Sequence, residues 1–426
     1  MQPADRGVTG GCGSAATRKS PAGSGPSNEH DIPGAEAKVV AFYLPQYHRI
    51  AENDAWWGDG FTDWVNVRRA RPLINGHDQP RVPTTLGYYD LRDVDVHHAQ
   101  AELARAHSVS AFCYYAYWFR GRRLLEQPLD LVGSSPELGM PYAICWANET
   151  WSRRWDGSEH EVLIAQDHSP AEDAAFVDGI AHHLADPRYL RVGDRPLLLL
   201  YRPGLLVDPI RTTDSLRERA LQLGLGELFL AMVQSFGHWE PISYGFDAAV
   251  EFPPHNLGVD PHAIRYRLPP ATGPKVNVTS YEDAMRVCLS RPVPLFAWFR
   301  AVMPGWDNTP RKGSGGTVYL GANPVLFRKW IEAVLECTYL FRPPGERLVF
   351  VNAWNEWAEG AFLEPDVSEG TERLEAIHQA LGAKTGLAEE TARLFASGSS
   401  GSNLLDVARA SWTGYRTPPW GSQSPP

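Results

Sequence analysis

The sequence predicts an α/β protein that folds as a single (β/α)8 barrel of the TIM type. Eight short apolar segments alternate with segments of helical periodicity along the 426 residues, which is the pattern of parallel strands joined by helical crossovers. Seven of these strands end in polar and aromatic residues at their carboxyl side, where barrel enzymes carry their active sites. A doubly wound sheet is the alternative, but the sequence has no GxGxxG or Walker motif to mark it.

Each strand is assigned from its apolar run and each helix from its periodicity and start signals. The predicted strands are Lys38–Tyr43, Ala111–Tyr115, Tyr142–Trp146, Pro196–Tyr201, Leu228–Val233, Ala248–Glu251, Leu295–Phe299 and Leu348–Asn352. The predicted helices are Val94–His107, a stretch within Leu124–Leu138, Pro170–Leu184, Asp214–Leu223, Ser280–Leu289, Pro324–Tyr339 and Glu372–Leu381. Ser169, Asp214 and Asn323 are the expected caps. The segment from Leu44 to Val67 is predicted to be a long functional loop, because it is rich in aromatic and acidic residues.

The barrel is predicted to occupy residues 38–396. Residues 1–37, rich in Gly, Ser, Ala and Pro, are expected to form a disordered leader, and residues 397–426 a flexible tail. The leader lacks the apolar core of a secretory signal, and no segment reaches the roughly 18 apolar residues of a membrane span. Five cysteines without a CxxC motif indicate reduced thiols. We therefore expect a cytoplasmic protein with no membrane span.

Composition excludes some classes of partner. A formal net charge of −10 argues against nucleic-acid binding, which needs a basic face. The cysteines show no metal-ligand spacing, and Asp93-Val94-Asp95, which resembles the DxD of metal-dependent transferases, begins a predicted helix. We therefore expect neither a metal nor a cofactor. The oligomeric state is left open by the sequence.

The segment Leu348–Asp366, LVFVNAWNEWAEGAFLEPD, carries the strongest chemical signal. A buried strand leads into carboxylates, amides and indoles, and Glu356 and Glu359 stand three residues apart. In a helical turn their Cβ atoms would lie ~5–6 Å apart. Two carboxyl groups that close suit acid–base work at a glycosidic bond, because they resist ionising together and one keeps its proton. Glu356 and Glu359 are therefore the predicted catalytic pair.

Aromatic and polar residues near the other strand ends are predicted to bind the sugar. These candidates are Tyr43, His48, Trp57, Trp64, Tyr115, Tyr117, Trp118, Trp146, Asn148, Glu149, Trp155, Asp156, Tyr201, Arg202, Gln234, Glu251, Trp306, Asn308, Trp354 and Asn355. Each also has a structural interpretation, since large aromatic residues fill cores. Arg202 and Arg311 suit a phosphate or uronate carboxylate, but ion pairs within the barrel mouth are the favoured interpretation.

Several motifs occur in order along the chain: FYLPQYH (Phe42–His48), WWGDGFTDW (Trp56–Trp64), CWANETWSRRWDG (Cys145–Gly157), GWDNTPR (Gly305–Arg311) and NAWNEWAEGAFLEPD (Asn352–Asp366). With them the chain resembles the WbsX-type family, described as glycosyltransferases of polysaccharide biosynthesis and related to glycoside hydrolase family 99. The resemblance covers about residues 38–381. It implies a (β/α)8 barrel.

The resemblance also implies roles for the two glutamates. In family 99 the NEWxEG motif carries the catalytic pair, which matches Glu356 and Glu359. In that family's endo-α-mannosidases the first deprotonates the sugar's 2-hydroxyl, giving an anhydro-sugar intermediate. The second protonates the leaving oxygen and later activates water. Elsewhere this chain follows the WbsX-type pattern, so the resemblance does not imply mannosidase specificity.

Three functional hypotheses follow. The leading one is an enzyme of glycoside hydrolase type, acting on an oligosaccharide or polysaccharide through the Glu pair, in the metabolism of a surface polysaccharide such as lipopolysaccharide. The second is a glycosyltransferase that uses an activated sugar donor in polysaccharide biosynthesis. The third is a non-catalytic glycan-binding barrel.

Overall fold

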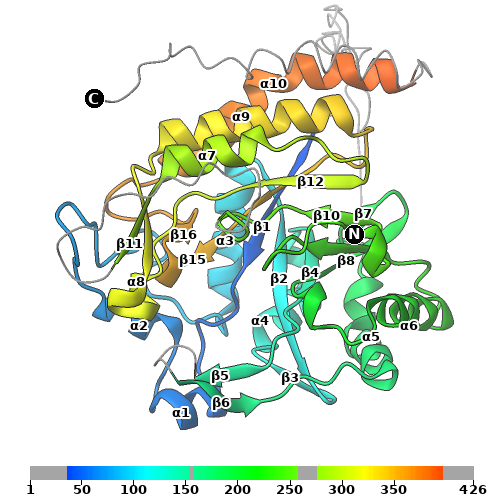
Figure 1. The fold of residues 1–426 in the computed structure, drawn as a ribbon, viewed down its shortest axis with the longest axis horizontal. Coiled ribbons are helices and arrows are strands. Elements are labelled where there is room, and N and C mark those ends of the chain that lie inside the picture. The colour runs from blue at the N-terminus through cyan, green and yellow to red at the C-terminus, as the bar shows by residue number, and fades with distance from the viewer. Residues whose placement is uncertain (1–35, 154–157, 258–275, 397–426) are drawn as a thin grey trace, which may run out of the picture. The chain divides into compact units, whose positions relative to one another are not determined.

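A closed barrel of eight parallel strands forms the centre of the structure (Figure 1). This computed structural model describes residues 36–153, 158–257 and 276–396. The barrel strands are β1 (Lys38–Tyr43), β2 (Val109–Phe119), β4 (Tyr142–Trp146), β8 (Arg195–Leu200), β9 (Phe229–Val233), β10 (Ala248–Val250), β12 (Ala297–Val302) and β14 (Leu348–Val351). They pair in chain order, and β1 closes the barrel because it pairs in parallel with both β14 and β2. The predicted (β/α)8 barrel is confirmed.

Helices follow the strands and cover the barrel. They are α3 (Val94–Ala106), α4 (Gln127–Ser134), α5 (Pro170–Leu184), α6 (Pro209–Gln222), α7 (Tyr281–Ser290), α9 (Pro324–Phe341) and α10 (Glu372–Ala396). Ser169 and Asn323 cap α5 and α9 as expected, since each side chain accepts a hydrogen bond from the first helical turn. The expected start of α6 was wrong. It begins at Pro209 with Asp208 as its cap, so Asp214 lies inside the helix.

Aromatic rings fill the inside of the barrel. The ring of Phe42 on β1 lies 5.7 Å from Tyr115, 4.9 Å from Phe252 and 5.6 Å from Phe350. Side chains from several strands thus close the interior, as in other barrels of this type, where it is a packed core and not a pore. Any large hollow must therefore lie above this layer, among the loops.

The segments that follow the strands contain short elements of their own. They are α1 (Ala51–Trp57), α2 (Asp63–Arg69), β3 (Arg122–Leu124), η1 (Pro136–Leu138), β5 (Trp151–Arg153), β6 (Ser158–Ile164), β7 (Arg191–Val192), η2 (Pro203–Leu205), η3 (Ile242–Tyr244), β11 (Asn277–Ser280), α8 (Thr309–Lys312), η4 (Gly313–Gly315), β13 (Thr317–Leu320), β15 (Asn355–Glu356), η5 (Trp357–Glu359) and β16 (Ala361–Phe362). The expected long loop after β1 holds α1 and α2, so it is largely helical. Neither helix has a side-chain cap, and each has only seven residues, so neither leaves a periodic signature.

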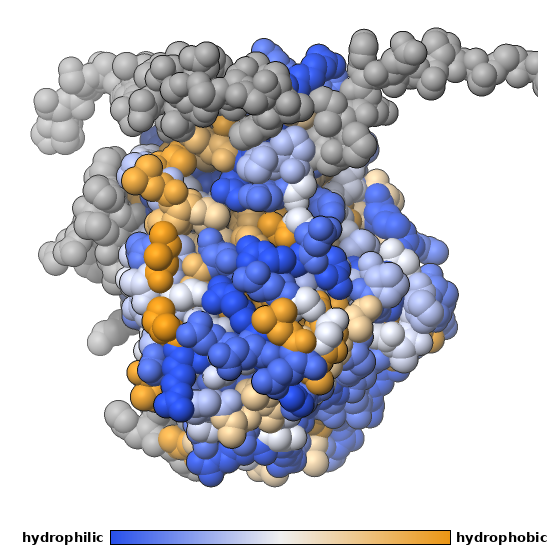
Figure 2. All heavy atoms as spheres, turned by 90° about the vertical axis from the view of Figure 1, so that its right-hand side faces the viewer, coloured by the Kyte–Doolittle hydropathy of each residue, from blue (hydrophilic) through white to orange (hydrophobic). Residues whose placement is uncertain are grey.

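The face over α5 and α6 is hydrophilic over most of its area, with isolated apolar residues (Figure 2). None of the described helices is long and apolar enough to cross a bilayer. Cys113, Cys145, Cys288 and Cys337 are buried and form no disulfide within the described part of the chain. The expected leader, apart from its last two residues, and the expected tail lie outside the described residues.

Candidate active site

A pocket of about 590 Å³ opens at the carboxyl ends of the barrel strands. Its walls come from the strand ends, from α1, from the β5–β6 hairpin and from the segment around α8. It is lined by Leu44, Gln46, Asn53, Trp56, Trp57, Tyr115, Tyr117, Ala147, Glu149, Thr150, Trp151, Ser152, Leu163, Tyr201, Arg202, Phe236, Phe252, His255, Trp306, Asn308, Arg311, Lys312, Asn352, Glu356 and Glu359. A concave, largely aromatic hollow with a few convergent charged groups is typical of a small-molecule or sugar site.

Glu356 and Glu359 lie together on one wall of this pocket. Glu356 ends β15, and Glu359 ends the short helix η5 that follows it. Gly360 allows the segment around Asp307 to approach closely. It has φ +61°, and a Cβ there would lie 2.8 Å from the Asp307 amide nitrogen. That amide donates to the Glu359 carbonyl at 2.6 Å, so a side chain at Gly360 would push the loop away from the pair.

Arg311 binds both glutamates. Its Nη2 lies 2.8 Å from Glu356 Oε2, and its Nη1 lies 2.6 Å from Glu359 Oε1. The same guanidinium contacts the fully buried Asp63 at 2.7 Å. One buried cation therefore faces three carboxylates, so full ionisation would place more negative charge around this guanidinium than it can balance. This confirms the favoured interpretation of Arg311 as an ion-pairing residue of the barrel mouth.

The environment raises the pKa of both glutamates. Burial is the main cause for Glu356, and the charges of Glu359 and Asp63 add to it, while Arg311 opposes it; the pKa rises to about 8. Burial also raises the pKa of Glu359, against the same opposition from Arg311. Because the two groups titrate together, the raised pKa belongs to the pair as a unit and favours its retention of a proton. A carboxyl group that keeps its proton beside one that ionises is the arrangement that acid–base chemistry needs.

Buried hydrogen bonds fix the backbone that carries the pair. The Asn355 side chain accepts from the Leu44 amide at 2.7 Å and donates to the Leu44 carbonyl at 3.0 Å. The Tyr47 hydroxyl donates to the Asn355 carbonyl at 2.7 Å. The buried carboxyl group of Glu364 accepts the indole N–H of Trp354 at 2.9 Å and of Trp357 at 2.6 Å. Burial raises the pKa of Glu364 to about 7.

Aromatic rings form much of the remaining wall. Trp151 on the β5–β6 hairpin lies edge-on to Trp56 at 5.8 Å and to Tyr117 at 5.0 Å. Tyr115 and Tyr201 meet edge-on at 6.0 Å. All five rings line the pocket, and such surfaces suit the apolar face of a sugar ring.

A second ion pair lies at the pocket between the ends of β4 and β8. Arg202 pairs with Glu149, and its guanidinium lies 3.5 Å from the ring centre of Phe236. This confirms the favoured interpretation of Arg202 as an ion-pairing residue. Asn148 holds the two strand ends together, since it accepts from the Arg202 amide at 2.7 Å and donates to the Arg202 carbonyl at 3.0 Å.

The structure brings to the pocket ten of the twenty predicted site residues that it describes. Trp57, Tyr115, Tyr117, Glu149, Tyr201, Arg202, Trp306 and Asn308 line it with Glu356 and Glu359. It does not bring Tyr43, His48, Trp64, Trp118, Trp146, Asn148, Gln234, Glu251, Trp354 or Asn355 to the pocket wall. Trp155 and Asp156 lie outside the described residues.

Five predicted residues on the first strands and in the segment after β1 do not line the pocket. They are buried or pack against helices and loops instead. Tyr43 donates to Gln100 of α3 at 2.7 Å. Trp146 stacks on Phe176 of α5 at 4.2 Å, and Trp118 packs on the same ring at 6.0 Å. Side chains alternate across a strand, so Tyr115 and Tyr117 face the pocket while Trp118 faces the helices. His48 is fully buried, and Trp64 donates to the Tyr89 carbonyl at 2.8 Å.

The remaining predicted residues outside the pocket wall form ion pairs or hydrogen bonds with buried charged, indole or backbone groups. Glu251 is fully buried and pairs with Arg291 at 2.6 Å and Arg300 at 2.9 Å. Gln234 donates to the Trp239 carbonyl at 2.9 Å and accepts from the Trp298 indole at 3.0 Å. Asn148, Trp354 and Asn355 hold the supporting contacts described above. These residues therefore position the site from behind and do not line it.

Some pocket residues are absent from the set predicted from the sequence. Asn53 is fully buried at the pocket wall, and neither of its amide atoms has a hydrogen-bond partner among the described residues. His255 Nδ1 is likewise buried and unpartnered, and burial lowers the pKa of His255 to about 4, so the ring is neutral. Buried polar groups are nearly always paired, so a bound hydroxyl or water can complete both. Trp56 also lines the pocket, and Asp63 contacts Arg311 beside it. Both lie in the motif WWGDGFTDW, which was the sequence signal that could have identified them.

Comparison with known proteins identifies a family for this chain. The model of the family described as Glycosyltransferase WbsX matches residues 39–377. "Uncharacterized protein WxcX" from two strains of Xanthomonas campestris pv. campestris is 48% identical over 348 residues, which are 81% of this chain and 50% of the relative. The chain thus spans about half the length of the curated relatives it matches.

Two solved structures are similar in fold. One is a "Glycoside hydrolase-like protein", with TM-score 0.52 and 13% identity, covering 84% of this chain and 97% of its own. The other is the GH99 endo-alpha-mannosidase from Bacteroides thetaiotaomicron, with TM-score 0.51 and 13% identity, covering 83% and 98%. At this identity the likeness shows the barrel fold alone.

Proposed function

We propose, on the premise that this chain belongs to the WbsX glycosyltransferase family and is a carbohydrate-active enzyme, that it acts at a glycosidic bond by acid–base catalysis through Glu356 and Glu359. The observation that carries the proposal is the arrangement of two carboxyl groups, the buried Glu356 and the partly buried Glu359, on one guanidinium in the wall of an aromatic pocket. A shared proton on such a pair supplies an acid and a base in the same place.

The proposed reaction has two steps, with the roles that the resemblance implies. In the reactive form the proton of the coupled pair lies on Glu359, and the ionised Glu356 takes the proton of the sugar's 2-hydroxyl, whose oxygen attacks the anomeric carbon. The bond to the leaving oxygen breaks, and Glu359 gives that oxygen its proton. Glu359 then takes a proton from water, whose oxygen attacks the anomeric carbon. The bond between that carbon and the 2-oxygen breaks, and Glu356 returns its proton to the 2-oxygen.

Arg311 has a positioning role in this scheme. It holds one oxygen of each carboxyl group, which leaves the other oxygen of each for proton transfer. Its charge also lowers the cost of ionising one member of the pair inside the protein. The ring surfaces of Trp56, Tyr117 and Trp151 are the proposed sugar platforms.

A screen of the purified protein against a defined glycan library, read by the mass of the products, tests the proposal. We expect turnover of at least one glycan, and none by Glu356→Gln or Glu359→Gln. Glu372→Gln is the matched control, because Glu372 is exposed at the start of α10. Glycan binding without turnover by the unmodified protein would instead support the non-catalytic barrel.

Transfer from an activated donor is the second candidate, favoured by the description of the family. Lys312 is exposed at the pocket, and within the described part of the chain it forms no ion pair with a carboxylate, so it is available for a donor phosphate. The same screen should include nucleotide sugars, and a rise in Tm with one donor would support transfer.

A role in surface-polysaccharide metabolism, a cytoplasmic location and the division of the chain at residues 37 and 397 stay predictions.

A further inference from the structure

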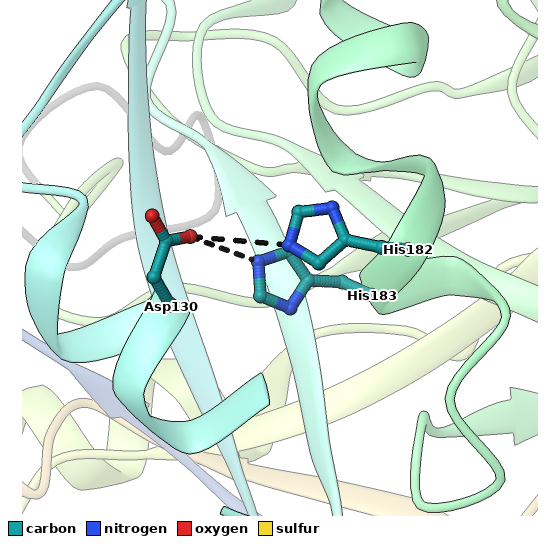
Figure 3. A group of neighbouring side chains, drawn as sticks. All are labelled: Asp130, His182 and His183. Carbon is teal, nitrogen blue, oxygen red and sulfur yellow. Dashed lines mark hydrogen bonds and ion pairs between the residues drawn. The ribbon is translucent and has the colours of Figure 1, made fainter. Parts of the chain in front are cut away.

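Three metal-binding side chains meet outside the barrel, between two neighbouring helices (Figure 3). Asp130 lies on α4, and His182 and His183 form the last turn of α5. Asp130 Oδ1 lies 3.4 Å from His183 Nε2 and 3.9 Å from His182 Nε2. The three ligand atoms all lie within 4.8 Å of one another, and none of the three residues lines the active-site pocket.

The surroundings of His183 fix which of its nitrogens carries a proton. Asp186 is paired with Arg188 at 2.6 Å and, as a carboxylate, can only accept hydrogen bonds. The Tyr142 hydroxyl therefore gives its one proton to Asp186, at 3.1 Å. His183 Nδ1, 3.2 Å from that hydroxyl, must then be the donor. A histidine that donates through one ring nitrogen in this way presents the other to a metal.

His183 Nε2 consequently directs a lone pair toward Asp130 Oδ1. Two acceptors at 3.4 Å repel each other, and a metal ion between them would bind both. His182 adds a third ligand on the same side. Its side chain is 60% exposed, so it can adjust its position without disturbing the core.

We propose that Asp130, His182 and His183 bind a divalent transition-metal ion of the zinc class. Zinc binds nitrogen and oxygen ligands at about 2.0–2.1 Å in a tetrahedron, which puts the ligand atoms about 3.3 Å apart. The distance from Asp130 to His183 already fits this value, and the one to His182 is 0.5 Å longer, by 3.9 against 3.4 Å. The fourth position, on the exposed side, would be left for water.

Two further residues shape this site. Gly133 on α4 allows the contact between the helices, because a Cβ there would lie 2.7 Å from His183 Cε1. Arg123 pairs with Asp130 through the other carboxylate oxygen, Oδ2, which leaves Oδ1 for the metal. The bound ion would join α4 to α5, two helices that cover β4 and its neighbours, and so would act on stability and not on the sugar chemistry.

Zinc titration of the full-length, chelator-treated protein tests the proposal, by calorimetry and by thermal unfolding. We expect binding of one ion per chain and a rise in Tm. Binding should weaken at least tenfold in both His182→Ala and Asp130→Asn, whereas His98→Ala, a change on α3, should bind as the unmodified protein does. Absence of one-to-one binding, or equal binding by all three variants, would overturn the proposal.

Discussion

Arg311 and Glu356 form a buried ion pair at 2.8 Å, and the same guanidinium holds Glu359 at 2.6 Å. The geometry of the proposed catalytic pair is therefore set from outside its own motif, by a residue on α8. This arrangement explains how two carboxyl groups remain side by side inside the protein. It also makes their protonation depend on one positive charge.

Replacement of Arg311 by glutamine should shift the pH dependence of activity. A nearby positive charge favours ionised carboxylates, so its loss raises the pKa of both glutamates further. The acid limb of the pH–rate profile, where the pair gains its second proton, should move to higher pH. We expect kcat to fall by roughly 10²–10³-fold at neutral pH, as when one preorganised electrostatic contact is lost elsewhere. An unchanged profile would contradict the assigned role.

Glu356→Gln should stabilise the protein at alkaline pH. Burial raises the pKa of Glu356 from its ordinary 4.5 to about 8 in the folded state, so the folded protein binds this proton more tightly than the unfolded chain does. The resulting stabilisation is complete below about pH 4.5 and is lost as the pH rises through about 8. Glutamine needs no proton to remain neutral and can still accept from Arg311.

Thermal unfolding of both proteins at pH 5 and pH 9 measures this effect. The Tm of Glu356→Gln relative to the unmodified protein should increase between the two conditions. Glu372→Gln, at an exposed position, should show no such change. A difference in Tm that is constant with pH would show that folding does not raise the pKa of Glu356.

Removal of the tryptophan rings at the pocket should weaken glycan binding. Trp56 and Trp151 are partly buried, meet edge-on at 5.8 Å and line the pocket together. Loss of a tryptophan anchor from a binding site commonly costs more than about 1 kcal/mol, which is roughly a tenfold rise in Kd per 1.4 kcal/mol. We expect Trp56→Ala and Trp151→Ala each to raise KM about tenfold with little change in Tm. Unchanged KM in both variants would exclude this wall as a sugar platform.

Glu364→Gln should lower both stability and activity. The carboxyl group accepts four hydrogen bonds, from Tyr89, Gln100, Trp354 and Trp357. A glutamine side chain replaces one accepting oxygen by an N–H₂ group that faces another donor. An unsatisfied buried group costs about 1–3 kcal/mol, and the disturbed Trp357 adjoins Glu356. Denaturant unfolding and kcat measure the two effects, and a variant with native stability and rate would contradict this role.

The sequence was sufficient for the fold because its signals are local. Apolar runs located all eight strands, and Ser169 and Asn323 located two helix starts. The helices α1 and α2 were missed because two turns without a cap carry no periodic pattern. The start of α6 was misplaced because Asp208 and Asp214 are equally good caps in sequence.

The site was predictable only in part, because side-chain direction is set by distant contacts. Trp306 and Trp354 both stand beside polar residues in recognised motifs, yet Trp306 lines the pocket and Trp354 donates to the buried Glu364. The partner of Arg311 at Asp63 lies 248 residues away. No local pattern in the sequence indicates such a contact, so Asp63 could not be placed beside the two glutamates from the sequence.

Single-turnover release of an activated aglycone tests the assigned acid–base roles most directly. A good leaving group needs no proton, so Glu359→Gln should release it at close to the native rate while it fails on the unactivated glycan. Glu356→Gln should fail on both, because the 2-hydroxyl keeps its proton. Full activity of either variant on the unactivated glycan would contradict the account.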